Sequence, residues 1–310
     1  IAPNMTVHGE GYVGSWSKNT QQYTTLRNQG RIAADRSGYL HVRPETLIND
    51  GVMDANGSNA RLQISAGQFQ NVGEVEINDG GQLYLNSEMD NTGEVNVNNG
   101  YLYLNQAMRT SDLGTVNVGT SGRVHVRSTL DNTDQVLDLG NTTIYMDGGK
   151  IVGGRVDNNL HAVNSPRLEG GVEIKGNLDF DEHRDIRVRN GLSIDGRARL
   201  DRSERLWFEY APGSEHQMLT GGPDSEVWLT YDYSSYYAEM GLRPYVHLTV
   251  DANTVVHGEG YVGTYGKSVQ TGTKLVNKGL IAADRSGDLR VGAAEIVNEG
   301  TMDANESNSA

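Results

Sequence analysis

Apolar and polar residues alternate in short runs along this chain, and the runs recur at a nearly constant spacing. Between residues 71 and 104, Val75 and Ile77 are followed by a glycine turn and then by Leu83 and Leu85, and the same order returns about 20 residues later. Alternation with a period of two is typical of a strand with one buried face. Because so small a unit cannot bury its own apolar face, it must stack on copies of itself, as in a solenoid.

An asparagine marks each of these repeats, in most of them as Asn-x-Gly, and an apolar residue precedes the marker by two positions. Asp112-Leu113-Gly114 takes the marker position once, and there Thr110 replaces the apolar residue. We expect the marker side chains to form an amide ladder in which each amide bonds to the next coil. The residues assigned to this structural turn ladder are Asn28, Asn49, Asn71, Asn91, Asn132, Asn277 and Asn298.

Each repeat contains three separate groups of apolar residues, one for each side of a coil. This pattern predicts an all-β chain wound as a three-sided parallel β-helix with about 20–21 residues per coil. Like residues of successive coils then lie about 4.8 Å apart. The marker fades after residue 135, but apolar pairs continue: Val172/Ile174 are expected to stack on Leu192/Ile194. Further on, Leu206/Phe208 are expected to stack on Val227/Leu229 and these on Leu248/Val250. The pattern predicts one continuous solenoid of about fifteen coils.

A second, longer period joins the two ends of the sequence. The motif His8–Gly14 returns as His257–Gly263, 249 residues later, and Ile32–Gly38 returns as Ile281–Gly287 at the same offset. We therefore expect residues 1–249 to be one solenoid module of about twelve coils, roughly 58 Å along the axis. Residues 250–310 are then the start of the next copy. The chain reads as an excerpt from a longer array of such modules.

The repeats resemble the β-strand-repeat passengers of autotransporter and filamentous-haemagglutinin-like exoproteins. The matching segments are L-x-N-x-G-x-I-x-A at Leu26–Ala34 and Leu275–Ala283, each followed by G-x-L-x-V at Gly38–Val42 and Gly287–Val291. The resemblance implies a right-handed β-helix displayed outside a bacterial cell, serving adhesion or a structural fibre. It implies no catalytic residues.

Composition narrows the possible partners. A net charge of −14 excludes a phosphate-binding surface of the usual basic kind, so we expect no nucleic acid partner. No segment is long and apolar enough to span a membrane. The absence of cysteine excludes disulfides and thiolate metal sites. We expect no cofactor; the Asp- and Asn-rich turns allow weak Ca²⁺ binding, although the calcium-binding nonapeptide repeat is missing.

Polysaccharide lyases and hydrolases also use the β-helix, so clustered carboxylates were considered as a catalytic site. The best candidate is the segment Asp179–Asp185, for which a solvated, salt-bridged turn is the favoured interpretation. His8 and its copy His257 lie beside glycine turns, where a structural role is expected. We therefore predict no catalytic residue and no enzyme activity.

Aromatic residues concentrate between positions 206 and 245 and form the main candidate binding site. Such rings can stack on sugars, bury a lateral contact between modules, or cover their own solenoid face. The residues are Trp207, Tyr210, Trp228, Tyr231, Tyr233, Tyr236 and Tyr237, of which the last four lie in an expected surface loop.

These observations predict a non-enzymatic, fibre-forming module of a long extracellular bacterial surface protein, assembled as a stiff rod. Its expected partners are further copies of itself, in tandem or by head-to-tail or lateral assembly, with surface glycans as a second possibility. An adhesin that binds glycans through the aromatic loop, and a β-helix polysaccharide lyase or hydrolase, stay open as alternatives.

Overall fold

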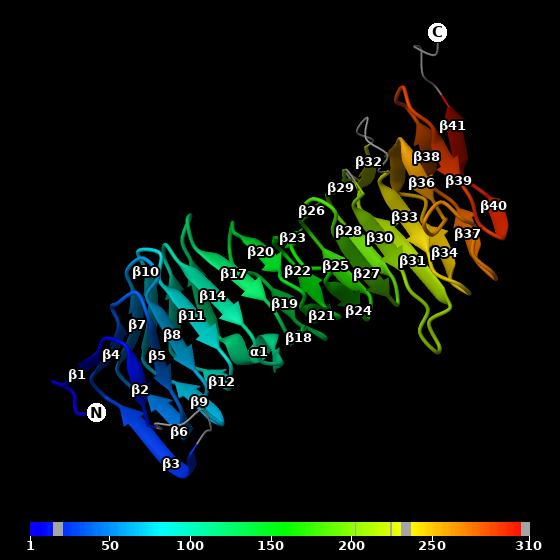
Figure 1. The fold of residues 1–310 in the computed structure, drawn as a ribbon. Helices are drawn as coiled ribbons and strands as arrows, with labels where there is room; N and C mark the ends of the chain where they lie inside the picture. Colours follow the sequence, from blue (N-terminus) through cyan, green and yellow to red (C-terminus); the bar gives the residue numbers. More distant parts are fainter. Residues whose placement is uncertain (15–20, 202, 224, 231–236, 305–310) are drawn as a thin grey trace. The chain divides into compact units, whose positions relative to one another are not determined.

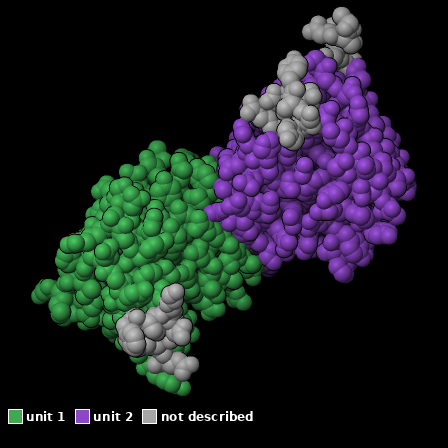
Figure 2. All heavy atoms as spheres, viewed as in Figure 1, with its two compact units in different colours: residues 1–131, 138–145 green, residues 132–137, 146–310 purple. Residues whose placement is uncertain are grey.

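The fold is a parallel β-solenoid, as a computed structural model of the chain shows (Figure 1). The structure describes residues 1–14, 21–201, 203–223, 225–230 and 237–304. Apart from the short helix α1 (Thr110–Leu113), the regular elements of this part of the chain are strands, and their pairing is parallel. The predicted three-sided parallel β-helix is confirmed. The chain divides into two compact units, residues 1–131 with 138–145 and residues 132–137 with 146–310 (Figure 2).

Unit 1 has three sheets, named here 1a, 1b and 1c, and the chain visits them in that order in each coil. Sheet 1a contains β1 (Thr6–His8), β4 (Arg31–Ala34), β7 (Val52–Asn56), β10 (Glu74–Asn78), β13 (Glu94–Val97) and β16 (Thr115–Val118). Sheet 1b contains β2 (Gly11–Val13), β5 (Tyr39–Val42), β8 (Arg61–Ile64), β11 (Gln82–Leu85), β14 (Tyr101–Leu104), β17 (Arg123–Val126) and β20 (Thr143–Met146). Sheet 1c contains β3 (Gln21–Asn28), β6 (Pro44–Asn49), β9 (Gln68–Asn71) and β12 (Glu88–Asn91), while β15 (Met108–Arg109) pairs instead with β18 (Thr129–Asp131).

Unit 2 also has three sheets, named 2a, 2b and 2c. Sheet 2a contains β19 (Val136–Leu137), β22 (Arg155–Val156), β25 (Val172–Ile174), β28 (Leu192–Ile194), β31 (His216–Gly221), β34 (His247–Val250), β37 (Lys274–Asn277) and β40 (Glu295–Asn298). Sheet 2b contains β23 (Asn159–Ala162), β26 (Leu178–Phe180), β29 (Arg197–Leu200), β32 (Glu226–Leu229), β35 (Val255–Gly258), β38 (Leu280–Ala283) and β41 (Thr301–Ala304). Sheet 2c contains β21 (Lys150–Val152), β24 (Arg167–Glu169), β27 (Asp185–Arg189), β30 (Arg205–Phe208), β33 (Glu239–Leu242), β36 (Gly260–Val262) and β39 (Leu289–Val291).

Like side chains stack on one another in the core. Val75 of β10 lies opposite Val95 of β13, and Leu83 of β11 lies opposite Leu102 of β14. All four side chains are buried, because alternate residues of each short strand point into the coil. A one-residue slip would turn every one of these side chains outward, so the apolar pattern fixes the register.

The Asn-x-Gly turns are stacked in the same way. The buried side-chain amide of Asn28 donates to Asn49 (2.8 Å), that of Asn49 to Asn71 (2.7 Å), and that of Asn71 to Asn91 (2.7 Å). In the consecutive turns at Gly51, Gly73 and Gly93, each glycine lies against the carbonyl of the glycine one coil earlier: a Cβ on Gly73 would meet that oxygen at 2.1 Å. These turns therefore require a residue without a side chain, and this close approach explains why glycine follows the marker asparagine by two positions.

The coils number about thirteen rather than the fifteen expected, because loops lengthen several of them. Arg197 of β29 pairs with Glu226 of β32, which lies 29 residues further along the chain. The expected register between Leu206/Phe208 and Val227/Leu229 is therefore wrong. Leu206 and Phe208 pair with Met240 and Leu242, whereas Val227 and Leu229 pair with Ala198 and Leu200.

The second copy of the module repeats the first strand by strand. In the first copy Thr6 pairs with Arg31, and in the second Val255 pairs with Leu280, which is the same register 249 residues on. The pairs β2–β5 and β36–β39, β3–β6 and β37–β40, and β4–β7 and β38–β41 agree in the same way. An ion pair also recurs, since His8 contacts Asp35 at 2.9 Å and His257 contacts Asp284 at 2.8 Å. Equal sequence thus gives equal coil geometry.

Candidate functional site

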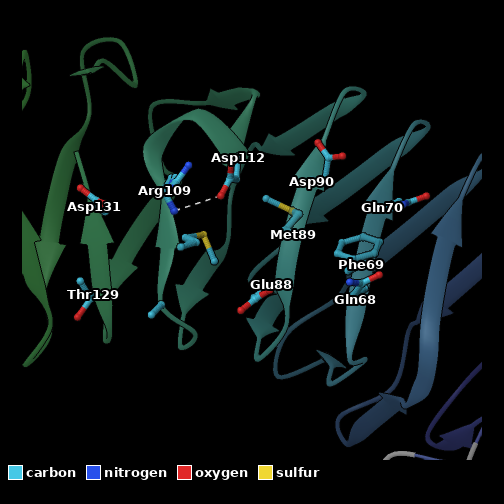
Figure 3. Close-up of a pocket in the computed structure, with 12 residues that line it drawn as sticks. Gln68, Phe69, Gln70, Glu88, Met89, Asp90, Arg109, Asp112, Thr129 and Asp131 are labelled. Carbon is cyan, nitrogen blue, oxygen red and sulfur yellow. Dashed lines mark hydrogen bonds between the residues drawn. The ribbon is translucent and has the colours of Figure 1, made fainter. Parts of the chain in front are cut away.

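Helix α1 interrupts the third side of unit 1 and opens a groove beside it (Figure 3). The marker of this coil is Asp112. The buried apolar residue before it is Met108, which pairs with Leu130, so the apolar position expected at Thr110 lies two residues earlier. The helix is inserted between Met108 and the turn. Its carboxyl end lies over Asn91, whose side-chain amide donates to the carbonyl of Leu113 at 2.7 Å. As a result β12 ends sheet 1c, and β15 begins a separate ladder.

The groove has an apolar floor and an acidic rim. Its volume is about 540 Å³. The floor is made of Phe69, Met89 and Met108, which are mostly buried. The polar lining residues come from β9, β12, β15, α1 and β18 and are Gln68, Gln70, Glu88, Asp90, Arg109, Asp112, Thr129 and Asp131 (Figure 3).

The four carboxylates of the rim differ in what they contact. Asp112 accepts a hydrogen bond from the backbone N–H of Arg109 at 3.3 Å. This N–H therefore donates to a side chain and not to the carbonyl of a neighbouring strand. Within the described residues, Glu88 and Asp90 form no ion pair or hydrogen bond through their side chains, and both are exposed. Arg109 is the one basic residue of the lining. The groove therefore has an excess of negative charge.

A second hollow of about 520 Å³ lies where β6, β9 and β12 begin, and it shares Gln68 and Glu88 with the groove. Its lining is polar and includes Glu45, Asn86 and Gln106. Because the two hollows share residues, the acidic surface continues past the start of β12.

The described members of the predicted aromatic cluster lie on different sheets and loops. Trp207 lies on sheet 2c and Trp228 on sheet 2b, whereas Tyr210 is partly exposed after the end of β30. Tyr237 contacts the ring of Tyr261 edge to face, with ring centroids 5.0 Å apart. Tyr231, Tyr233 and Tyr236 lie outside the described residues.

The two tryptophan rings already have partners on their faces. Trp207 is buried under Tyr265, at 4.4 Å between ring centroids. Trp228 stacks with His257 at 5.9 Å and lies under the guanidinium groups of Arg197 (5.0 Å) and Arg285 (4.6 Å). A sugar ring would have to displace these contacts, so neither tryptophan offers a free stacking face.

Sequence analysis missed a ladder of rings on the outer face of sheet 1b. Tyr84 stacks on Tyr103 at 4.7 Å between centroids, Tyr103 lies 4.8 Å from His125, and His125 stacks on Tyr145 at 5.0 Å. Burial and the neighbouring tyrosines raise the pKa of Tyr84 to about 12. The sequence did contain a signal for this ladder. Tyr84 and Tyr103 each lie between two buried leucines of a strand, so both point outward, and they are paired on neighbouring coils.

The ring ladder is also the least acidic face of unit 1. Its outward positions carry arginine, and Arg61 lies 4.9 Å from the ring of Tyr39 and Arg123 5.7 Å from that of Tyr101. Since stacked rings turn their faces toward one another, solvent meets mainly their edges. The ladder therefore ties coils together rather than presenting a flat binding surface.

The other candidates from the sequence are part of ion-pair networks. Asp181 contacts His161 at 2.7 Å and Asp185 contacts Arg205 at 3.7 Å, both across neighbouring coils. In the second copy, His257 contacts Glu226 (3.0 Å) as well as Asp284. These partners satisfy the side chains structurally.

Two buried glutamates in unit 2 have raised pKa values. Burial raises the pKa of Glu204 to about 8, and burial also raises that of Glu239, which accepts hydrogen bonds from Thr264 (2.7 Å) and the backbone of Gly266 (3.1 Å). The hollow beside Glu239 has a volume of about 100 Å³, which suits a few water molecules. It is too small for a sugar substrate.

The described residues contain no group of His, Asp and Glu side chains arranged to hold a metal ion. No helix among them is long and apolar enough to cross a lipid bilayer. No protein-family model, curated protein or solved structure matches this chain.

Proposed function

We propose that this chain is a non-enzymatic structural segment of a longer array of the same module, which forms a stiff rod on the outside of a bacterial cell. One observation carries the proposal: the second copy reproduces the strand register of the first at a constant offset of 249 residues. A chain that repeats its coil geometry in this way continues its own solenoid.

The two copies differ in what covers them, and the difference supports an array. Tyr12 is 50% exposed at the open edge of the first copy, whereas its equivalent Tyr261 is 5% exposed because β33 pairs beside it. At the other edge, Met302 is 38% exposed and its equivalent Met53 is 0% exposed beneath β10. A residue that is exposed at one edge is therefore buried in the other copy, where a further coil covers it.

Specific contacts also distinguish the covered edge from the open one. In the second copy, Glu226 and Trp228 of β32 contact His257 of β35. The equivalent of His257 in the first copy is His8, whose described ion-pair contact is with Asp35 in the following coil. A preceding module would present its own Glu226 and Trp228 to His8.

The extracellular location belongs to the same proposal. The β-strand-repeat resemblance, the net charge of −14 and the absence of cysteine all fit a secreted acidic rod. The expected partners are further copies of the chain. The faces of Trp207 and Trp228 are occupied by neighbouring rings, and the hollow beside Glu239 is only about 100 Å³ in volume. Neither the glycan-binding nor the enzymatic alternative therefore gains support from an observation of its own.

The test is a two-module chain in which residues 1–249 precede the present sequence without a linker. We expect amide hydrogen exchange in the second module's β1 and β2 to slow by at least tenfold, because both strands gain a paired neighbour. The control carries a flexible glycine-serine linker of about 20 residues at the junction, which adds the same mass without enforcing the register. Unchanged exchange in the direct fusion would refute the proposal.

A further inference from the structure

We propose that the groove beside α1 binds a basic, extended peptide segment, which adds as a strand to the free edge of β12. This goes beyond the rod, because it assigns the module a protein partner. The starting observation is that sheet 1c ends at β12 in the middle of unit 1, whereas sheets 1a and 1b continue past this coil.

The free edge supplies the main-chain recognition. An unpaired strand edge presents a row of backbone groups that another extended chain can pair with. β12 has four residues, and α1 lies over the last of them, Asn91. The open part of the edge is therefore roughly 10 Å long and accommodates about three residues of a partner. The facing β15 is less available, since the N–H of Arg109 already donates to Asp112.

The side chains of β12 specify the sequence of the partner. Glu88 and Asp90 point outward, so basic residues at alternate positions of an added strand lie directly opposite two carboxylates that have no partner in the described residues. Met89 points to the other side, where it forms part of the apolar floor, and favours an apolar residue between the two basic ones. The expected motif is therefore basic–apolar–basic.

Other classes of ligand fit less well. A glycan needs an exposed ring face, and the single ring of the lining, Phe69, is buried. A nucleic acid would bring phosphates against Glu88, Asp90, Asp112 and Asp131. A basic peptide is favoured by both the charge of the rim and the free backbone edge.

The test measures binding of a fluorescein-labelled peptide, Arg-Val-Arg-Val-Arg, to the full chain by fluorescence anisotropy at low salt. We expect saturable binding that becomes about fivefold to tenfold weaker in the double variant Glu88→Gln/Asp90→Asn, which removes both charges opposite the arginines. The matched control is Glu74→Gln/Glu94→Gln, which removes two exposed carboxylates from sheet 1a and should leave the affinity unchanged. Absence of binding, or equal weakening in both double variants, overturns the proposal.

A second pair of probes tests strand addition separately from charge. One peptide is N-methylated at both valines and the other at the arginines, so that each lacks one of the two alternating sets of N–H groups. Because an added strand turns alternate residues toward its neighbour, one methylated peptide should lose binding and the other should retain it. Equal affinities for the two peptides would show that charge alone attracts them, and this outcome overturns pairing with β12.

Discussion

Removing one rung of the amide ladder tests whether buried asparagines hold the coils together. Asn71 is 0% exposed, accepts a hydrogen bond from Asn49 and donates one to Asn91, each at 2.7 Å. Its amide also lies near the carbonyls of Gly73 (3.4 Å) and Glu94 (3.3 Å). The substitution Asn71→Ala removes these contacts without adding volume.

The expected cost follows from the hydrogen bonds that are lost. Each of the two side-chain bonds contributes about 1 kcal/mol net. The side-chain oxygen of Asn91 also loses its donor in a buried site, which costs about 1–2 kcal/mol more. The side-chain amide of Asn49 keeps one partner, the carbonyl of Glu74 at 3.0 Å, and adds little. We therefore expect Asn71→Ala to lower the local free energy of unfolding by about 3–4 kcal/mol.

The measurement is amide hydrogen exchange in the coils on either side of residue 71, because solenoids open locally rather than as a single unit. The control is Asn298→Ala, at the exposed edge of sheet 2a, where Asn277 loses one acceptor but still donates to Thr301 at 2.9 Å. We expect that change to cost no more than about 1 kcal/mol. Equal costs for the two variants would refute the role assigned to the buried ladder.

Two further predictions concern the core and a buried acid in unit 2. Phe208→Ala should lower the stability of unit 2 by about 3–5 kcal/mol in urea unfolding, since Phe208 is fully buried. Tyr210→Ala, at a partly exposed site, should cost less than about 1 kcal/mol. Similar costs for the two variants would contradict the packing described here. Because the pKa of Glu204 is raised to about 8 from 4.5, the contribution of this group to stability should be full below pH 4.5 and should be lost as the pH rises to 8. Glu204→Gln should flatten this part of the pH–stability profile, and an unchanged slope would show that another group is responsible.

The repeat pattern was enough to predict the core of unit 1, because the strands there are short and the loops constant. Val75 and Val95 could be aligned directly, since each follows its marker asparagine by four residues. The same reasoning failed at Leu206, where the chain between paired strands lengthens to 34 residues and the spacing no longer identifies the partner, Met240. Periodicity therefore predicts register only where loop length is constant.

The candidate groove could not be predicted, because it arises from an insertion rather than from a motif. The replacement of an apolar residue by Thr110 marked the irregular coil, but a single polar residue gives no sign of a helical turn. Likewise, the aromatic segment around Trp207 and Trp228 drew attention by its density, although loops distribute these residues over different sheets. Successive strands of one coil lie on different sides of a solenoid, and many of the side chains that meet are a coil apart.

The identity of register between the two copies has a consequence for how such a gene can change. His8 and His257 stand at the same point of the same coil, so a crossover between the repeats joins two edges that already match. Unequal recombination would then delete or duplicate one whole module and leave every junction intact. Length becomes a trait that varies in steps of 249 codons, without any new interface having to evolve.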